Sequence, residues 1–285
     1  MEKNQDNVHH HPETKADALL SILKQQESAA ICFSGGTDST FLLYAAKTAL
    51  KNRVIALTAR SATVSTDEIM AAKNICQLLD VPHVIVETSE MQSNDFTANP
   101  SDRCYHCKKI RLAQLIHAAT ARNMVCLMDG ENRDDAKDYR PGRLASEEQG
   151  VLHPLEMAGL TKSEIRELSR QAGLSNWNQP SNACLASRIP HGQPITTEKL
   201  ERIDRCETFL KSQGVSSIIR VRHDGGVARI EIAPPDLEKL SDESLRKRII
   251  LFFKQSGFHA IAVDLEGYRT GSLNMHGHDL SRNRF

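Results

Sequence analysis

The strongest chemical signal in the sequence is the glycine-rich segment Ser34-Gly35-Gly36-Thr37-Asp38-Ser39. It follows the apolar run 29–33 and precedes the run 40–47, so a strand, a loop and a helix are predicted here. Two consecutive glycines let the backbone take positive φ and bring several N–H groups to one phosphate at a helix N-terminus. Asp38 stands where it could hold a Mg²⁺ ion that bridges the phosphates. The loop lacks the lysine of a Walker A sequence and the G-x-G-x-x-G spacing, and an ordinary polar turn remains the alternative. The expected nucleotide-binding residues of the loop are Ser34, Gly35, Gly36, Asp38 and Ser39.

A second polar segment, Gly130-Glu131-Asn132-Arg133-Asp134-Asp135, follows another apolar run. In a parallel sheet it would lie at the same edge as the glycine-rich loop. Gly130 and Asn132 are therefore expected to contact the nucleotide. A solvated turn rich in Asn and Asp is the alternative for this segment. Lys162 could likewise contact a phosphate or be a solvated lysine at a helix start.

The seven cysteines fall into two groups. An odd number in a chain without a secretion signal favours thiols or ligands over disulfides. Three cysteines, Cys104, Cys107 and Cys184, lie in predicted loops or at element ends, and a helix N-terminus at Cys104 and Cys107 would stabilise thiolates. Three thiolates can hold an iron-sulfur cube by three corners, while zinc or unrelated thiols remain open. The other four are expected to be buried as small hydrophobic side chains: Cys32, Cys76, Cys126 and Cys206.

Two arginines alternate on a predicted strand at Arg220-Val221-Arg222. Alternate residues of a strand share a face, so the two guanidinium groups form a fork suited to a phosphate. A solvated charged face is the more ordinary alternative.

The elements that must position these residues alternate between short β-rich runs and helical segments. Strands are expected at 29–33, 53–58, 83–87 and 124–128, with helices between them, which predicts an α/β fold with a parallel sheet. After a proline-punctuated stretch the pattern restarts with a helix, two strands around Asp224-Gly225-Gly226, a helix and a strand. We therefore expect a disordered tail over 1–15, a nucleotide-binding domain over 16–193, a small α+β domain over 194–275 and a mobile tail over 276–285.

Composition limits the classes of function. The 285 residues carry 36 basic and 36 acidic side chains, and a net charge of zero argues against a wide nucleic-acid footprint. No run is long and apolar enough to span a bilayer, and the N-terminus lacks a signal-peptide core, so a cytoplasmic protein is expected.

With these motifs assembled, the glycine-rich loop resembles the PP-loop of the ATP pyrophosphatases, and the chain from about 17 to 275 closely resembles the LarE family. The resemblance rests on SGGTDS at 34–39, GEN at 130–132, PSNACLASR at 180–188, RVR at 220–222 and GYRTGSLN at 267–274. Members of that family are ATP-dependent sulfur transferases that build the nickel-pincer nucleotide cofactor of lactate racemase and related racemases.

The resemblance implies that a carboxylate of pyridinium-3,5-biscarboxylic acid mononucleotide is adenylated, after which sulfur attacks and AMP leaves. In one branch of the family the cysteine matching Cys184 gives up its own sulfur, whereas in the other three cysteines matching Cys104, Cys107 and Cys184 hold a 4Fe-4S cluster. Because all three are present, the resemblance favours the cluster-dependent mechanism. It also implies that Arg220 and Arg222 grip the mononucleotide phosphate and that the chain forms a homo-oligomer, a hexamer.

Two rival functions belong to related chemistry. A PP-loop tRNA thiolase also uses three cysteines, but its usual RNA-binding module or additional C-x-x-C pairs are absent from this sequence. An ammonia-using PP-loop amidating synthetase would leave the three thiols without a role. A non-catalytic nucleotide-binding protein is a third possibility. It is disfavoured because the glycine-rich loop and a reactive thiol loop are expected to meet at one edge of the sheet.

Overall fold

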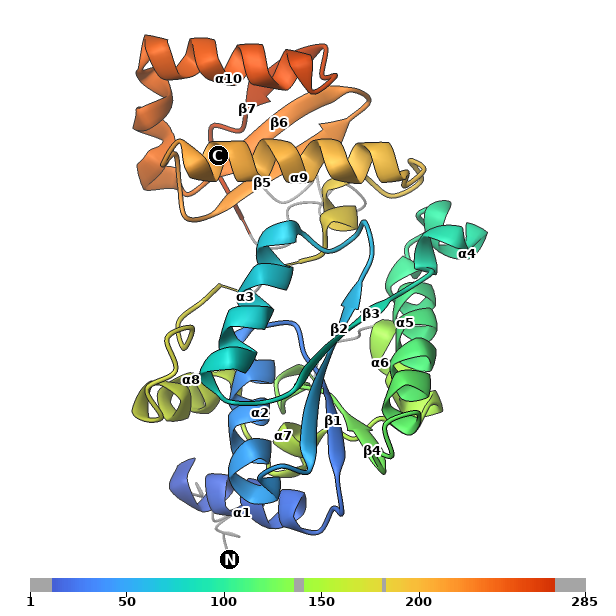
Figure 1. Ribbon diagram of the computed structural model, residues 1–285. Coiled ribbons are helices and arrows are strands. Elements are labelled where there is room, and N and C mark those ends of the chain that lie inside the picture. The colour runs from blue at the N-terminus through green and yellow to red at the C-terminus, as the bar shows by residue number, and fades with distance from the viewer. Residues whose placement is uncertain (1–11, 136–140, 181–182, 270–285) are drawn as a thin grey trace, which may run out of the picture. The chain divides into compact units, whose positions relative to one another are not determined.

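The computed structural model describes residues 12–135, 141–180 and 183–269 (Figure 1). The described residues form two compact units. The first unit combines 12–61, 68–90 and 104–180, and the second combines 62–67, 91–103 and 183–269. The chain therefore passes between the units several times.

The first unit is built around a four-stranded parallel sheet with the order β3-β2-β1-β4. β1 lies between two partners, since Ile31 pairs with Ala56 of β2 on one side and with Met128 of β4 on the other. All four strands point the same way, so their carboxyl ends share one edge. The strands are β1 (Ala29–Cys32), β2 (Val54–Arg60), β3 (His83–Glu87) and β4 (Cys126–Met128).

Helices cover both faces of this sheet. Figure 1 shows α2 and α3 on one side and α5 on the other. Alternate residues of β1 serve the two layers, because Ala29 and Ile31 pack with α2 and α3, whereas Ala30 packs with Leu112 and Leu115 of α5. The helices are α1 (Pro12–Lys24), α2 (Thr37–Leu50), α3 (Thr66–Leu78), α5 (Arg103–Thr120), α6 (Pro141–Glu148), α7 (Pro154–Met157) and α8 (Lys162–Gln171).

The second unit contains a three-stranded sheet with the order β5-β6-β7. β5 (Ile219–Asp224) and β6 (Val227–Ile232) are antiparallel, and β7 (Ala260–Val263) runs parallel to β6. One face of this sheet packs against α9 and α10 in a single apolar core. The short helix η1 (Glu90–Gln92) begins in the first unit and ends in the second. The other helices of the second unit are α4 (Asn94–Thr97), η3 (Leu185–Arg188), α9 (Thr197–Ser212), η4 (Pro234–Ser241) and α10 (Glu243–Gln255).

The predicted fold class is confirmed: a PP-loop type parallel sheet and a smaller second sheet are present. α8 begins directly after Thr161, which forms both bonds of a capping box with Glu164. One boundary is wrong, since α1 begins at Pro12, inside the segment assigned to a disordered tail. The strand expected at 124–128 begins only at Cys126, and the helix expected to start around Cys104 and Cys107 begins at Arg103.

The predicted domain limits at 193 and 275 stay a prediction. The compact units divide the chain differently, because the second unit begins at 183 and includes 62–67 and 91–103. Several expectations lie outside the described residues: the tail over 1–15 as far as residue 11, the tail over 276–285, and parts of the segments 180–188 and 267–274. Among the described helices, none has the length and apolar character that crossing a membrane requires.

Candidate functional site

The glycine-rich loop leads from β1 directly into α2, as predicted. Gly35 takes a φ of 74°, and a Cβ atom there would lie 3.3 Å from the backbone of Ala72 in α3. Gly36 is the N-cap of α2 with a φ of −73°, so only the first of the two glycines uses positive φ. The Ser34 and Ser39 hydroxyl oxygens lie 3.1 Å apart, which closes the loop across its base. The ordinary-turn alternative is disfavoured by this closed geometry at a helix N-terminus.

The segment after β4 meets this loop. A Cβ atom at Gly130 would lie 3.0 Å from the backbone nitrogen of Ser39, so only glycine fits here without displacing the loop. The Asn132 side chain, which is fully buried, donates from Nδ2 to Asp38 Oδ2 over 3.2 Å. The structure thus brings the two sequence motifs together, and the alternative of a solvated turn is wrong for Asn132.

Asp38 lies in an electrostatically unusual position. Burial raises the pKa of its carboxyl group and the nearby Asp135 adds to this effect, whereas Lys162, Asn132 and Arg166 act in the opposite direction. Within the described part of the chain, Asp38 Oδ1 and Arg166 Nε are both buried without a hydrogen-bond partner. Such atoms cost free energy when unsatisfied, so they fit the binding of a charged ligand at this helix N-terminus. Lys162 lies near enough to act on Asp38, which supports its phosphate-contact alternative.

Asn176 holds the loop from outside and was missed by the sequence analysis. Its Nδ2 donates to the Gly35 carbonyl and to Thr40 Oγ1, each over 2.9 Å. The Thr37 hydroxyl donates to the Asn176 carbonyl over 2.8 Å. The only local signal was an asparagine in the Ser-Asn-Trp-Asn stretch after α8, and nothing in its spacing connects it with a loop 141 residues away.

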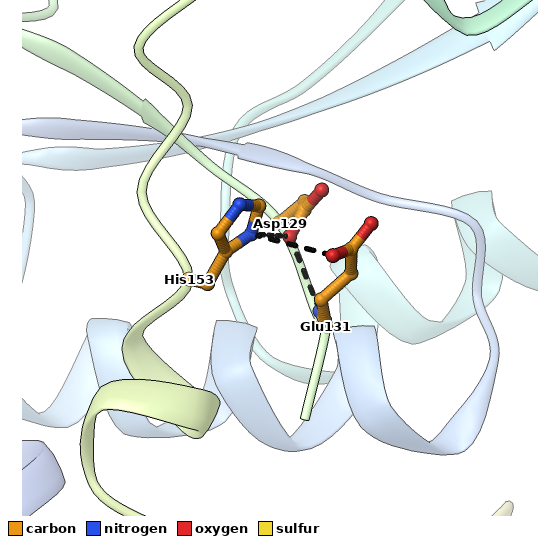
Figure 2. A group of neighbouring side chains, drawn as sticks. All are labelled: Asp129, Glu131 and His153. Atoms are coloured by element: carbon orange, nitrogen blue, oxygen red, sulfur yellow. Dashed lines mark hydrogen bonds and ion pairs between the residues drawn. The ribbon is translucent and has the colours of Figure 1, made fainter. Parts of the chain in front are cut away.

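A charged cluster lies beside the same segment (Figure 2). His153 Nδ1 lies 2.6 Å from Asp129 Oδ1 and 3.9 Å from Glu131 Oε2. The Lys108 ammonium contacts the other oxygens, Asp129 Oδ2 at 3.1 Å and Glu131 Oε1. Burial alone would lower the pKa of His153, but the hydrogen bond and charge of Asp129 outweigh it and raise the pKa. The hydrogen bond with His153 and the charges of Lys108 and His153 lower the pKa of Asp129 despite its burial.

This cluster has a composition that could bind a metal ion, because one atom each of Asp129, Glu131 and His153 lie within 4.8 Å of one another. Lys108 contacts both carboxylates, and Asp129 raises the pKa of His153, which favours the positively charged ring that would balance them without a metal. Through Lys108, the residue after Cys107, the cluster connects α5 with the segment that contacts the glycine-rich loop. Asp129 and Lys108 were not predicted, although a carboxylate directly after a strand was a usable signal.

Burial is confirmed for Cys76 and Cys206, whereas Cys32 and Cys126, which were also expected to be buried, are only half-buried. Burial raises the pKa of the Cys76 thiol to about 12 and that of Cys206 to about 11. Burial raises the pKa of Cys32 and Cys126 as well. These thiols stay protonated at neutral pH and are unsuited to metal binding.

The other three cysteines lie at helix starts, and none of them is fully buried. Cys104 is exposed and Cys107 is half-buried, and both lie near the beginning of α5 at a spacing that places them on one face. Cys184 is the half-buried N-cap residue of η3 in the second unit. None of the seven cysteines, all of which the structure describes, is in a disulfide. The three-thiol site itself stays a prediction.

Arg220 and Arg222 lie on the face of β5 opposite the apolar core. The expectation of a solvated face is wrong, because the two residues are only 8% and 5% exposed. Arg222 forms a 2.7 Å ion pair with Glu231, which is itself fully buried, and donates to the Ser187 carbonyl over 3.0 Å. Arg220 Nη1 donates to the carbonyl of Ile219, and the guanidinium group lies 5.1 Å from the centre of the Tyr268 ring.

Burial lowers the pKa of Arg220, and the charges of Arg188 and Arg222 add to this effect. Arg188 is 1% exposed and lies 3.0 Å from Glu207. Its Nη1 also donates to the Cys184 carbonyl over 3.0 Å. Arg188 and Arg222 therefore bond the backbone of η3, at the Cys184 and Ser187 carbonyls, while each is paired with a buried glutamate.

The chain is similar to several known proteins. The family described as queuosine biosynthesis protein QueC matches residues 28–125, which include the glycine-rich loop and β1 to β3. An uncharacterized protein of Synechocystis sp. is 36% identical over 262 residues, covering 92% of this chain and 97% of the relative. An uncharacterized protein of Methanocaldococcus jannaschii is 34% identical over 172 residues, covering 60% of this chain and 66% of the relative.

A third relative has a named activity. The pyridinium-3,5-bisthiocarboxylic acid mononucleotide synthase of Lactiplantibacillus plantarum is 30% identical over 263 residues, covering 92% of this chain and 94% of the relative. The resemblance seen in the motifs is thereby confirmed across nearly the whole length of both chains. The chain belongs to the LarE family.

Proposed function

We propose that the chain is an ATP-dependent sulfur transferase that converts the carboxylates of pyridinium-3,5-biscarboxylic acid mononucleotide into thiocarboxylates. The observation that carries this proposal is the full-length similarity to the synthase of that thiocarboxylate, together with a phosphate loop whose Asp38 lacks a partner at Oδ1. A substrate carboxylate oxygen would attack the α-phosphorus of ATP and expel pyrophosphate. Sulfur would then attack the acyl carbon of the adenylate, and AMP would leave.

The ATP half of the site is the edge formed by the glycine-rich loop. The free N–H groups at the start of α2 would receive a phosphate, and Asn132 would orient Asp38. The orphaned Oδ1 of Asp38 fits a Mg²⁺ ligand, because a carboxylate oxygen is the donor that this ion prefers. Arg166, with its buried and unsatisfied Nε, would neutralise charge on the pyrophosphate as it leaves.

The mononucleotide phosphate would bind at Arg220 and Arg222. The depressed pKa of Arg220 marks a site where a buried cation lacks a full counter-charge, and a phosphate would supply it. Glu231 fixes Arg222 through their ion pair, so the fork is held before the substrate arrives.

Cys104, Cys107 and Cys184 would hold a 4Fe-4S cluster. The donor set fits, because three thiols lie at helix starts, none is in a disulfide, and two share one face of α5. Bound there, the cluster would present one iron without a protein ligand, which can carry an exchangeable sulfide. The protein residues would supply the rest: the Arg188 bond to the Cys184 carbonyl would orient that backbone, and the arginine fork would place the substrate.

The test combines anaerobic purification, iron and acid-labile sulfide analysis, and turnover with ATP, Mg²⁺ and the mononucleotide. We expect substrate-dependent release of AMP and pyrophosphate, about four irons per chain, and an unchanged protein mass. Absence of iron together with a mass loss of about 34 Da at Cys184 would replace the cluster with a sacrificial cysteine, since that is the mass of H₂S.

The alternatives give different results. An amidating synthetase would keep full activity when Cys104, Cys107 and Cys184 are all changed to Ala. A tRNA thiolase would release AMP in the presence of tRNA and not with the mononucleotide.

A further inference from the structure

Asn99 is a fully buried residue in the second unit with an unusual backbone conformation. Its φ is 61°, in the left-handed region that asparagine tolerates better than most residues. Its Nδ2 group lies 2.8 Å from the carbonyl oxygens of Pro190 and Gln193 and 3.4 Å from that of Ile189. One amide group thus gathers three carbonyls of the chain segment that follows η3.

Arg103 reinforces the same junction. It is 7% exposed, and its Nη1 donates to Asn99 Oδ1 and, over 3.3 Å, to the Ile189 carbonyl. Two backbone bonds join the same pair of segments, from Gly192 N to Asn99 O and from Ile195 N to Thr97 O. Residues 97–103 and 189–195 therefore form one hydrogen-bonded block within the second unit.

Two of the proposed ligand cysteines are attached to this block. Cys104 is the next residue after Arg103. Cys184 lies five residues before Ile189, and the short η3 helix between them is held by the bond from Arg188 to the Cys184 carbonyl. The block thus includes the residue before Cys104 and continues, through η3, the segment that starts at Cys184.

We propose that Asn99 is a positioning residue that holds residues 189–195, which follow Cys184 and η3, against residues 97–103, which end one residue before Cys104. No other side chain type at this position combines a ready left-handed φ with an amide that can donate to the gathered carbonyls. The consequence for cluster loading rests on the proposed function, whereas the role of Asn99 in joining these two segments does not.

The test uses Asn99→Gly in the full-length protein. Glycine keeps the positive φ and removes only the amide, so the backbone conformation stays allowed. The matched control is Ser216→Ala, which removes a buried hydroxyl of the same unit that bonds Asp236, Ile218 and Ala233. Arg103→Met is a second variant, which removes the reinforcing bonds at similar side-chain volume.

Two readouts are measured. The first is the rate at which dibromobimane bridges Cys104 to Cys184 in the apo-protein, identified by peptide mass, in a Cys107→Ala background that prevents bridging within α5. The second is iron bound per chain after anaerobic reconstitution, with all cysteines present. We expect Asn99→Gly to lower the bridging rate at least tenfold and iron to below one per chain, Arg103→Met to lower both less, and Ser216→Ala to leave both unchanged.

The outcomes separate this inference from the proposed function. Bridging and loading of Asn99→Gly equal to those of the unmodified protein would overturn the positioning role and leave the proposed cluster intact. Equal losses in Asn99→Gly and Ser216→Ala, or no bridging in the protein with native Asn99, would also overturn it. An Asn99-dependent bridging rate in a protein that binds no iron would support the positioning role and refute the cluster.

Discussion

Changing Asn176 to Ala tests how the phosphate loop is held in shape. The substitution removes two hydrogen bonds, to the Gly35 carbonyl and to Thr40 Oγ1, and leaves the bond from Thr37 to the Asn176 backbone carbonyl. At about 1 kcal/mol for each lost bond, the bound shape of the loop loses about 2 kcal/mol. If the whole loss falls on the binding-competent loop, the Kd for MgATP rises about 30-fold.

The assay is isothermal titration of MgATP into the apo-protein, accompanied by thermal unfolding. Asn178→Ala is the matched control, because Asn178 is exposed two residues further along the same segment. We expect Asn176→Ala to weaken MgATP binding by a factor of about 10 to 30 and Asn178→Ala to leave it unchanged. A Kd within about twofold of the native value for a folded Asn176→Ala protein would refute the role of this side chain in shaping the loop.

Three further predictions follow from the charges of the site. Burial raises the pKa of Asp38, so the apo-protein loses stability as the pH rises through that pKa. The Asp38→Asn variant should therefore melt at a higher temperature than the native protein at neutral pH and at the same temperature in acid. It should also lose Mg²⁺-dependent ATP binding in titration. Burial lowers the pKa of His153, but Asp129 outweighs this effect and raises it. The stabilisation of the fold by charged His153 is therefore complete below about pH 6.5 and is lost as the pH rises through the folded-state pKa. Denaturant unfolding should show that His153→Gln lowers the free energy of unfolding more at about pH 6 than at about pH 9. Arg220→Lys removes a planar donor from the phosphate fork and should weaken mononucleotide binding about 10- to 100-fold with an unchanged Kd for MgATP; equal loss of both affinities would count against the assignment.

The sequence predicted the parallel sheet well because strong local signals marked its elements. β-rich runs, glycines and capping residues act within a few positions of one another, as the capping box at Thr161 illustrates. The meeting of Gly130 and Asn132 with the glycine-rich loop was also predictable, since parallel strands bring their carboxyl ends to one edge.

What the sequence did not predict depends on contacts between distant segments. Asn176 and Asn99 are polar residues in loops, and only the folded chain shows which carbonyls they bind. The burial of Arg220 and Arg222 was likewise unpredictable, because alternation on a strand gives the shared face but not what covers it. The opposite charge that makes their burial tolerable lies on β6, at Glu231.

The repeated passage of the chain between the two compact units affects how the protein can be synthesised and divided. Residues 62–67 and 91–103 emerge from the ribosome well before residues 183–269, with which they form the second unit. The hydrogen bond between Thr66 and Asp204, and that between Asn99 and Pro190, can form only after the second residue of each pair has been synthesised. The second unit therefore has long sequence separations between its contacts and should fold late, only after residues 183–269 have been synthesised. No single cut in the chain yields both units whole, so each can be isolated only by joining segments that are separate in the natural order.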